Sequence, residues 1–213
     1  MIDKRYIVVE GPIGVGKTSL VEMIGEEFGA RVILERVEDN PFLPGFYRDP
    51  SRHAFQTQIF FLLSRFQQQK ELAQQDLFSQ SIVCDYLFAK DRIFASVNLG
   101  EDELALYRQI YSLLDQRIPR PDLVIYLQSP TEVLQQRIRR RGRSFEREIN
   151  RDYIAAVNEA YNRFFFSYDR TPLLIINTAD VDFVRRPEDF QDLVREIRRM
   201  RKGVQFYVPL GSA

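Results

Sequence analysis

The clearest chemical signal lies in a glycine-rich segment near the N-terminus. This segment, GPIGVGKT, matches the pattern G-x-x-x-x-G-K-[ST] at Gly11, Gly16, Lys17 and Thr18, with Gly14 as a further loop glycine. Glycines allow backbone N–H groups to turn inward around phosphates, and the following helix adds the positive end of its dipole. The lysine of such a loop reaches the β- and γ-phosphates, and the hydroxyl ligates Mg²⁺. The sequence therefore predicts a site for ATP or GTP with Mg²⁺, and it leaves the acceptor open.

Two carboxylates form a second candidate group. Glu35 and Asp85 end the second and third apolar runs of the chain. Ligands of open parallel sheets bind at the carboxyl ends of the strands, so both acids are expected at the edge of the phosphate loop. One acid can serve there as a base and the other as a partner of a metal or of water. For each acid taken alone, a functional role and an exposed position that caps a loop are equally good interpretations.

Strands and helices alternate along the chain. Short apolar runs rich in β-branched or aromatic residues are typical of strands buried on both faces, and they occupy 6–10, 31–35, 81–85, 121–127 and 172–177. Helical stretches lie between and after them, at 17–28, 53–75, 101–116, 130–141, 146–168 and 187–201. This alternation predicts an α/β fold with a parallel sheet and helices on both faces. With no repeat or linker in view, we expect one domain, 1–213.

Composition excludes several other classes. The 213 residues carry 30 basic and 30 acidic side chains, so no global field favours nucleic acid or an anionic membrane. The single cysteine, Cys84, excludes a disulfide framework, and the single histidine, His53, excludes a histidine metal cluster. No apolar stretch approaches 18 residues and no signal-like region opens the chain, so a cytoplasmic protein is expected.

Several segments together resemble the deoxynucleoside kinases, most closely the branch of deoxycytidine, deoxyguanosine and bacterial deoxyadenosine kinases. They follow the P-loop in the family's order and read LERVEDNPFLPGFY at 34–47, FQTQIFFLLSR at 55–65, DYLFAKDRIFA at 85–95 and RIRRRGRSFE at 137–146. The resemblance spans nearly the whole chain. It implies a P-loop kinase fold, a five-stranded sheet in the order 2-3-1-4-5, an arginine-rich lid and a homodimer.

The resemblance implies roles for three residues at the sugar. Glu35 matches the general base that takes the proton of the 5′-hydroxyl. Tyr47 and Glu146 match the residues that hold the 3′-hydroxyl of the deoxyribose.

Three further residues match positions that recognise the base. Gln58 matches a side-chain amide that pairs with the base edge, and an amide offers a donor and an acceptor together. Arg65 and Asp91 match an arginine and an aspartate that complete base recognition, and an ion pair between them would hold both in place. Seven residues separate Gln58 from Arg65, so both lie on one helix face. A plain amphipathic helix with a polar side is the alternative interpretation.

Arginines gather in the segment RIRRRGR. Alone, this run favours RNA or DNA binding, but zero net charge and the shortness of the cluster weigh against it. The resemblance implies instead a lid over ATP at about 137–146. Arg137, Arg141 and Arg143 would there meet the phosphates during transfer, when negative charge spreads over the γ-phosphoryl oxygens. In the loop NTADVDFV, Asp182 and Phe183 match residues that contact adenine.

One position departs from the family pattern. The family usually follows its strand-three acid with Arg-Ser, whereas this chain has Tyr86 and Leu87 after Asp85. Asp85 can still act near Mg²⁺ or support the base. The role of the missing arginine has no evident holder in the sequence.

The sequence thus predicts ATP-dependent phosphorylation of the 5′-hydroxyl of a deoxynucleoside in nucleotide salvage. Arg65 with Asp91 argues against thymidine, whose 5-methyl group needs apolar space, and favours deoxyadenosine or deoxyguanosine, with deoxycytidine still open. A nucleoside monophosphate kinase, such as a thymidylate kinase, is the nearest alternative, but the Glu35 carboxylate would repel an acceptor phosphate. A P-loop NTPase that drives a partner or a nucleic acid is the other alternative, and such proteins usually carry an extended basic surface.

Overall fold

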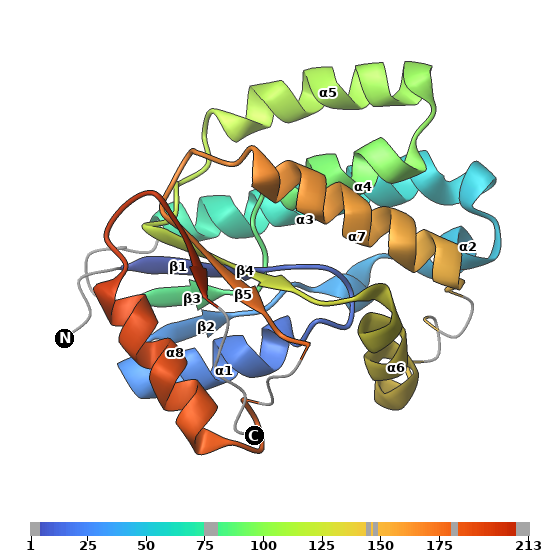
Figure 1. Ribbon diagram of the computed structural model, residues 1–213. Coiled ribbons are helices and arrows are strands. Elements are labelled where there is room, and N and C mark those ends of the chain that lie inside the picture. Colours follow the sequence, from blue (N-terminus) through green and yellow to red (C-terminus); the bar gives the residue numbers. More distant parts are fainter. Residues whose placement is uncertain (1–4, 75–80, 144–145, 147–148, 180–182, 208–213) are drawn as a thin grey trace.

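A computed structural model describes residues 5–74, 81–143, 146, 149–179 and 183–207 of the chain (Figure 1). Its centre is a parallel sheet in the order β2-β3-β1-β4-β5-β6. The strands are β1 (Tyr6–Glu10), β2 (Arg31–Ile33), β3 (Ile82–Cys84), β4 (Leu123–Gln128), β5 (Leu173–Asn177) and β6 (Val204–Tyr207). The predicted order of the first five strands is confirmed.

The sheet has six strands where the sequence predicts five. The additional strand, β6, lies at the sheet edge beside β5. Its residues Val204 and Phe206 are exposed, while the residues between and after them are half-buried. A short edge strand with this pattern has no continuous apolar run, and a continuous run was the signal used to find the other strands.

Helices connect the strands close to the predicted positions. They are α1 (Lys17–Phe28), α2 (Leu43–Arg48), α3 (Pro50–Gln74), α4 (Lys90–Asn98), α5 (Glu101–Asp115), α6 (Thr131–Arg141), α7 (Arg151–Phe166) and α8 (Pro187–Arg199), with a 3₁₀ turn, η1, at Val37–Asp39. The short elements α2, α4 and η1 were not predicted. Helix α7 starts later than expected because Asn150 caps it by accepting a hydrogen bond from the Tyr153 backbone N–H at 2.7 Å.

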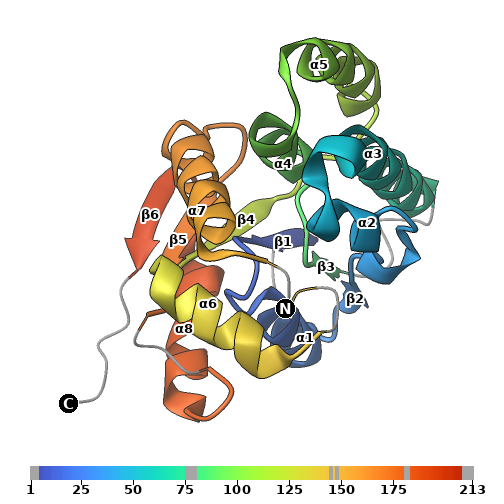
Figure 2. The same cartoon turned by 90° about the vertical axis from the view of Figure 1, so that its right-hand side faces the viewer.

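Alternating residues of the strands β1 to β5 face two separate apolar cores. Ile7 and Val9 of β1 pack toward α1, α6 and α8, whereas Tyr6 and Val8 pack toward α4 and α7. In Figure 1, α1 and α8 lie on one side of the sheet and α3, α4 and α7 on the other, and Figure 2 shows the same layers turned by 90°. This two-sided burial gives the continuous apolar runs seen in the sequence.

A third core holds the helices that lie beyond the sheet. Leu43 and Phe46 of α2, Leu62 of α3 and Tyr107 and Tyr111 of α5 belong to this cluster. Helix α5 lies farthest from the sheet, over α4 (Figure 1). Within the described ranges, the structure contains no helix whose length and apolar character would suit a membrane span.

Candidate active site

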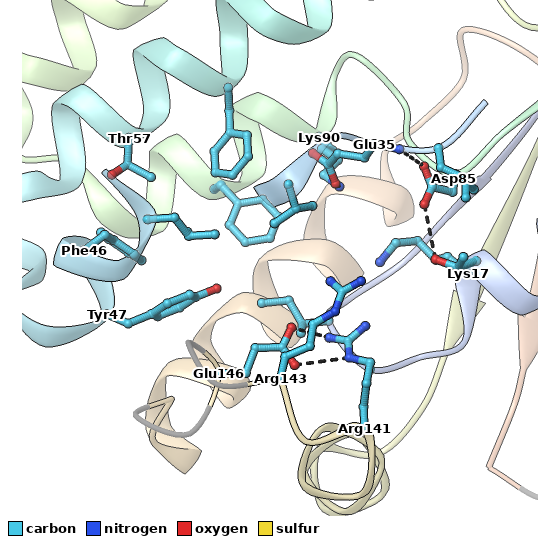
Figure 3. Close-up of a pocket in the computed structure, with 18 of the residues that line it drawn as sticks. Lys17, Glu35, Phe46, Tyr47, Thr57, Asp85, Lys90, Arg141, Arg143 and Glu146 are labelled. Carbon is cyan, nitrogen blue, oxygen red and sulfur yellow. Dashed lines mark hydrogen bonds and ion pairs between the residues drawn. The ribbon is translucent and has the colours of Figure 1, made fainter. Parts of the chain in front are cut away.

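A cavity of about 420 Å³ lies between the P-loop and the helices α2 and α3 (Figure 3). One end is lined by the P-loop residues Gly14, Gly16, Lys17 and Thr18. The other end is lined by side chains of α2, α3, α4 and α7, and arginines of α6 and the following segment close one side. Residues predicted for the phosphate donor and residues predicted for the acceptor therefore share one cavity.

The P-loop backbone has the conformation that its glycines permit. Gly14 and Gly16 have φ values of +83° and +104°, a region that other residues rarely adopt. A Cβ atom on Gly14 would also lie 2.7 Å from Cγ1 of Ile138 in α6. Lys17 Nζ donates to the carbonyl oxygen of Gly11 at 2.7 Å, and burial lowers the pKa of Lys17 to about 8. The loop thus presents a buried ammonium group where the terminal phosphates of a nucleotide would lie.

Thr18 and Asp85 form an oxygen pair suited to Mg²⁺. Thr18 Oγ1 donates to Asp85 Oδ2 at 3.3 Å, and Asp85 Oδ1 accepts from the Glu35 backbone N–H at 2.7 Å. Burial and the charge of Glu35 raise the pKa of Asp85, a cost that a bound cation would offset. Mg²⁺ takes one or two protein oxygens and completes its shell with phosphates and water, which fits this pair. Across the described ranges, no cluster of three or more metal-ligating side chains occurs.

Two cations hold the carboxylate of Glu35. Arg65 donates from Nε to Glu35 Oε1 at 2.7 Å and forms an ion pair with the same oxygen through Nη2. Lys90 Nζ lies 2.6 Å from Glu35 Oε2. Burial alone would raise the pKa of Glu35, but Arg65 and Lys90 outweigh it and lower the pKa to about 2. Glu35 is therefore an ionised carboxylate in the cavity wall.

Arg65 also forms the predicted ion pair with Asp91, through Nη1 and Oδ1. Asp91 is fully buried behind Arg65, outside the cavity wall, so it faces the cavity only through that arginine. The guanidinium lies 4.7 Å from the ring centroid of Phe61, another cavity residue. The structure thus brings Arg65 and Asp91 together as expected, and it adds a link to Glu35 that the sequence did not indicate.

Gln58, Tyr47 and Glu146 all line the cavity. Gln58 is 2% exposed, and its Oε1 atom has no hydrogen-bond partner in the described part of the chain. A buried acceptor without a partner is costly, so a ligand that donates to it is favoured. Tyr47 packs edge-on against Tyr153, with ring centroids 6.5 Å apart. Glu146 accepts from Arg141 Nε at 3.1 Å.

The three predicted lid arginines line the cavity but differ in their contacts. Arg137 is fixed to the protein, donating to the Thr178 carbonyl at 2.7 Å and to the Val15 carbonyl of the P-loop at 3.2 Å. Arg141 forms its ion pair with Glu146, beside Arg143 (Figure 3). The lid arginines therefore lie between the phosphate end and the predicted sugar end.

The two residues predicted to contact adenine, Asp182 and Phe183, are not among the described residues that line this cavity. Phe183 packs against the core on the α1 and α8 side of the sheet and does not line the cavity. Asp182 lies outside the described residues. Their role at adenine stays a prediction.

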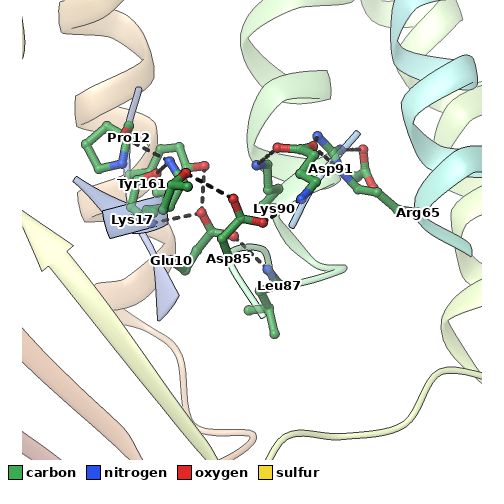
Figure 4. Close-up of polar contacts among 12 residues, drawn as sticks. Glu10, Pro12, Lys17, Arg65, Asp85, Leu87, Lys90, Asp91 and Tyr161 are labelled. Atoms are coloured by element: carbon green, nitrogen blue, oxygen red, sulfur yellow. Dashed lines mark hydrogen bonds and ion pairs between the residues drawn. The ribbon is translucent and has the colours of Figure 1, made fainter. Parts of the chain in front are cut away.

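Sequence reasoning missed two charged residues of the site, Lys90 and Glu10. Glu10 is fully buried and accepts from the Gly11 N–H at 2.8 Å, the Leu87 N–H at 2.7 Å and the Tyr161 hydroxyl at 3.1 Å (Figure 4). It joins the start of the P-loop to the segment after β3 and to α7. Its signal was its position at the end of a strand, as for Glu35 and Asp85.

The P-loop and the carboxylate of Glu35 line the same cavity, and this arrangement defines a P-loop phosphotransferase. The family model for deoxynucleoside kinases matches residues 7–202, and the chain belongs to that family.

Two relatives with assigned activities match along nearly their whole length. The deoxyguanosine kinase of Bacillus subtilis (strain 168) is 34% identical, over 92% of this chain and 97% of its own. The deoxyadenosine kinase of Lactobacillus acidophilus is 31% identical, over 91% of this chain and 94% of its own. Among solved structures, the deoxyadenosine kinase of M. mycoides with bound dATP is 27% identical, with a TM-score of 0.78 over 89% of this chain and 99% of that one.

Proposed function

We propose that the chain transfers the γ-phosphoryl group of ATP to the 5′-hydroxyl of a purine deoxynucleoside, deoxyguanosine or deoxyadenosine. Relatives of both activities match at similar identity, and a relative that also acts on deoxycytidine matches at 30%. The observation that carries the proposal is the placement of Glu35 in one cavity with the P-loop lysine and with Gln58, whose Oε1 atom has no hydrogen-bond partner among the described residues.

The reaction needs a base, an electrophile and charge stabilisation. The 5′-hydroxyl gives its proton to Glu35 as its oxygen forms a bond to the γ-phosphorus. The bond from that phosphorus to the bridging oxygen breaks, its electron pair stays on the β-phosphate, and ADP leaves. Lys17 and the lid arginines Arg137, Arg141 and Arg143 stabilise the negative charge on the transferring group.

Thr18 and Asp85 would hold Mg²⁺ at the phosphate end. The ion would neutralise phosphate charge when bound. The hydrogen bond from the Glu35 N–H to Asp85 ties the base to this pair, so the donor and acceptor ends are positioned together.

The sugar and base are assigned to the other end of the cavity. Tyr47 and Glu146 hold the 3′-hydroxyl, and the ion pair of Glu146 with Arg141 connects sugar binding to a lid arginine. Gln58 pairs with the base edge, and Arg65 adds fixed donors there. Asp91 supports Arg65 from behind. A methylated pyrimidine meets a charged guanidinium at this position, which favours purines over thymidine.

Family membership and the acceptor carboxylate favour a nucleoside over a nucleoside monophosphate as acceptor. They equally disfavour an NTPase that drives a partner. We also propose a homodimer through α3 and α5, which contact one another and carry the exposed residues Leu63, Leu106 and Leu113. Nucleotide salvage and a cytoplasmic location remain predictions.

ATP consumption tests the proposed reaction. With Mg²⁺ present, turnover should be slow with ATP alone and should rise when deoxyguanosine or deoxyadenosine is added. Chromatography should show the 5′-monophosphate in amounts equal to ADP. Thymidine and thymidine monophosphate serve as comparison acceptors. Rapid turnover without any nucleoside, or a preference for thymidine monophosphate, would contradict the proposal.

A further inference from the structure

Lys90 is a buried cation in the wall of the active-site cavity. It is the first residue of α4, 4% exposed, and its Nζ atom lies 2.6 Å from Glu35 Oε2. Burial would lower the pKa of Lys90, but Glu35 and Glu10 outweigh it and raise the pKa. The ammonium group therefore keeps its charge.

The burial of the Lys90 charge has an unfavourable free energy of desolvation. Removing an ammonium group from water costs several kcal/mol, and an ion pair offsets this only with good geometry. An apolar side chain at the same place would avoid the cost. The buried ammonium group of Lys90 contacts Glu35, the carboxylate assigned as the base. This contact indicates that Lys90 serves the reaction and not only the packing of the core.

The two oxygens of Glu35 are not equivalent. Oε1 accepts two contacts from Arg65, through Nε and Nη2, which use its acceptor capacity. Oε2 accepts one hydrogen bond from the described residues, the one from Lys90. Oε2 thus keeps a lone pair for a further donor, and Lys90 fixes the direction in which that oxygen faces.

Lys90 also supplies a cation to the site, where this chain lacks the family arginine directly after Asp85. Tyr86 is fully buried in the core under α4 and α7 and carries no charge. Lys90 lies four residues after Tyr86, at the start of α4, and lines the active-site cavity. Together with burial, its charge lowers the pKa of Lys17.

We propose that Lys90 is a positioning residue for Glu35, holding Oε2 as the oxygen that accepts the 5′-hydroxyl proton. The inference rests on the proposed function, in which Glu35 is the base. When Oε2 takes the proton, the Glu35 carboxylate becomes neutral and Lys90 keeps its charge.

A double-mutant cycle tests the proposal. The variants are Lys90→Met, Glu35→Gln and both together, with Lys90→Arg as the conservative replacement and Lys70→Met, an exposed lysine of α3, as the matched control. We expect Lys90→Met to lower kcat about 10²-fold while the KM for ATP changes less than about threefold. Lys90→Arg should recover at least about a tenth of the wild-type kcat, and Lys70→Met should leave kcat unchanged.

The double variant gives the decisive comparison. If Lys90 acts through Glu35, Lys90→Met should lower kcat by less than about threefold in the Glu35→Gln background. Independent losses that multiply, or a wild-type kcat for Lys90→Met, would overturn the role of Lys90 and leave Glu35 as base. A Glu35→Gln variant with near-normal kcat would overturn the proposed function together with this inference. Should Lys90→Met fail to fold, as judged by circular dichroism, the kcat of Lys90→Arg decides, because a loss equal to that of Glu35→Gln would contradict the proposal.

Discussion

Glu35 is ionised because of its contacts with Arg65 and Lys90, and these contacts make the stability of the fold depend on pH. Its pKa is lowered from an ordinary value of 4.5 to about 2 in the folded protein. A lowered folded-state pKa stabilises the fold above the unfolded-state value, and this contribution is lost as pH falls through the folded-state value. The window is therefore pH 4.5 to about 2, and the shift corresponds to about 3 kcal/mol.

Chemical denaturation across pH measures this contribution. Glu35→Gln should be less stable than wild type by about 3 kcal/mol at pH 7, and the difference should shrink as pH falls toward 2.5. Glu159→Gln removes a highly exposed carboxylate of α7 and serves as control, with a small difference at every pH. A Glu35→Gln difference that does not change with pH would contradict the assigned ion pairs.

Arg65 and Asp91 set the chemistry of the base end of the cavity. Arg65→Met leaves Asp91 buried without a partner, costing about 3–5 kcal/mol and impairing every substrate. Arg65→Met with Asp91→Ala removes both charges, while Glu35 keeps its contact with Lys90. The double variant should lose purine activity and gain thymidine activity, because the 5-methyl group then has apolar space.

The measurement is kcat/KM for four deoxynucleosides on wild type, both single variants and the double variant. Cytosine and the two purines provide the comparison within each variant. Additive losses without a shift toward thymidine would show that these residues do not read the base.

At the residue scale, the sequence predicts the contacts that the family resemblance implies and leaves out others made by tertiary packing. Arg65 and Asp91 were expected as a pair, and the structure forms it. Lys90 in the same motif received no role from the sequence, because only the packing of α4 against the cavity buries it. The contact between Arg65 and Glu35 joins segments 30 residues apart, so no local pattern encodes it.

At the scale of elements, the P-loop is predictable because each glycine has a local conformational reason. Gly14 combines a positive φ with a close approach to α6. Gly14→Ala should therefore strain the loop by about 1–3 kcal/mol and push it against Ile138. We expect weaker ATP binding, by at least about tenfold, together with lower stability.

Gly100→Ala provides the matched control at the N-cap of α5. Gly100 has a φ of −67° and no atom within 4 Å of the added Cβ. Calorimetry of ATP binding and thermal unfolding compare the two variants. Equal ATP affinity for Gly14→Ala and wild type would contradict the role of the P-loop geometry.

The elements that the sequence missed have weak or short signals. Strand β6 alternates exposed and half-buried residues, and it is recognised as a strand by its pairing with β5. Helix α4 has nine residues, too few for a clear period. The other five strands and the long helices are predictable from the sequence without such context.

At the scale of the whole molecule, exposed leucines on α3 and α5 support the proposed homodimer. Leu63, Leu106 and Leu113 are 49%, 48% and 70% exposed. Leu63→Glu with Leu113→Glu should place charges in an apolar interface and separate the subunits. Light scattering should give twice the mass of one chain for wild type and the mass of one chain for this variant.

Phe166→Glu is the control, because Phe166 is 94% exposed on a different helix, α7. It should keep the mass of wild type. A wild-type mass equal to one chain at micromolar concentration would contradict the homodimer.

The proposed reaction depends on Glu35 as the base that activates the 5′-hydroxyl in a cavity shared with ATP. Glu35→Gln keeps the size of the side chain and removes the base. The most direct measurement is kcat for deoxyguanosine and deoxyadenosine phosphorylation by this variant, with the ATP dissociation constant measured alongside. We predict a loss in kcat of roughly 10²–10⁴-fold with little change in ATP affinity. Near-normal formation of the 5′-monophosphate by Glu35→Gln would contradict the assignment of Glu35 as the base.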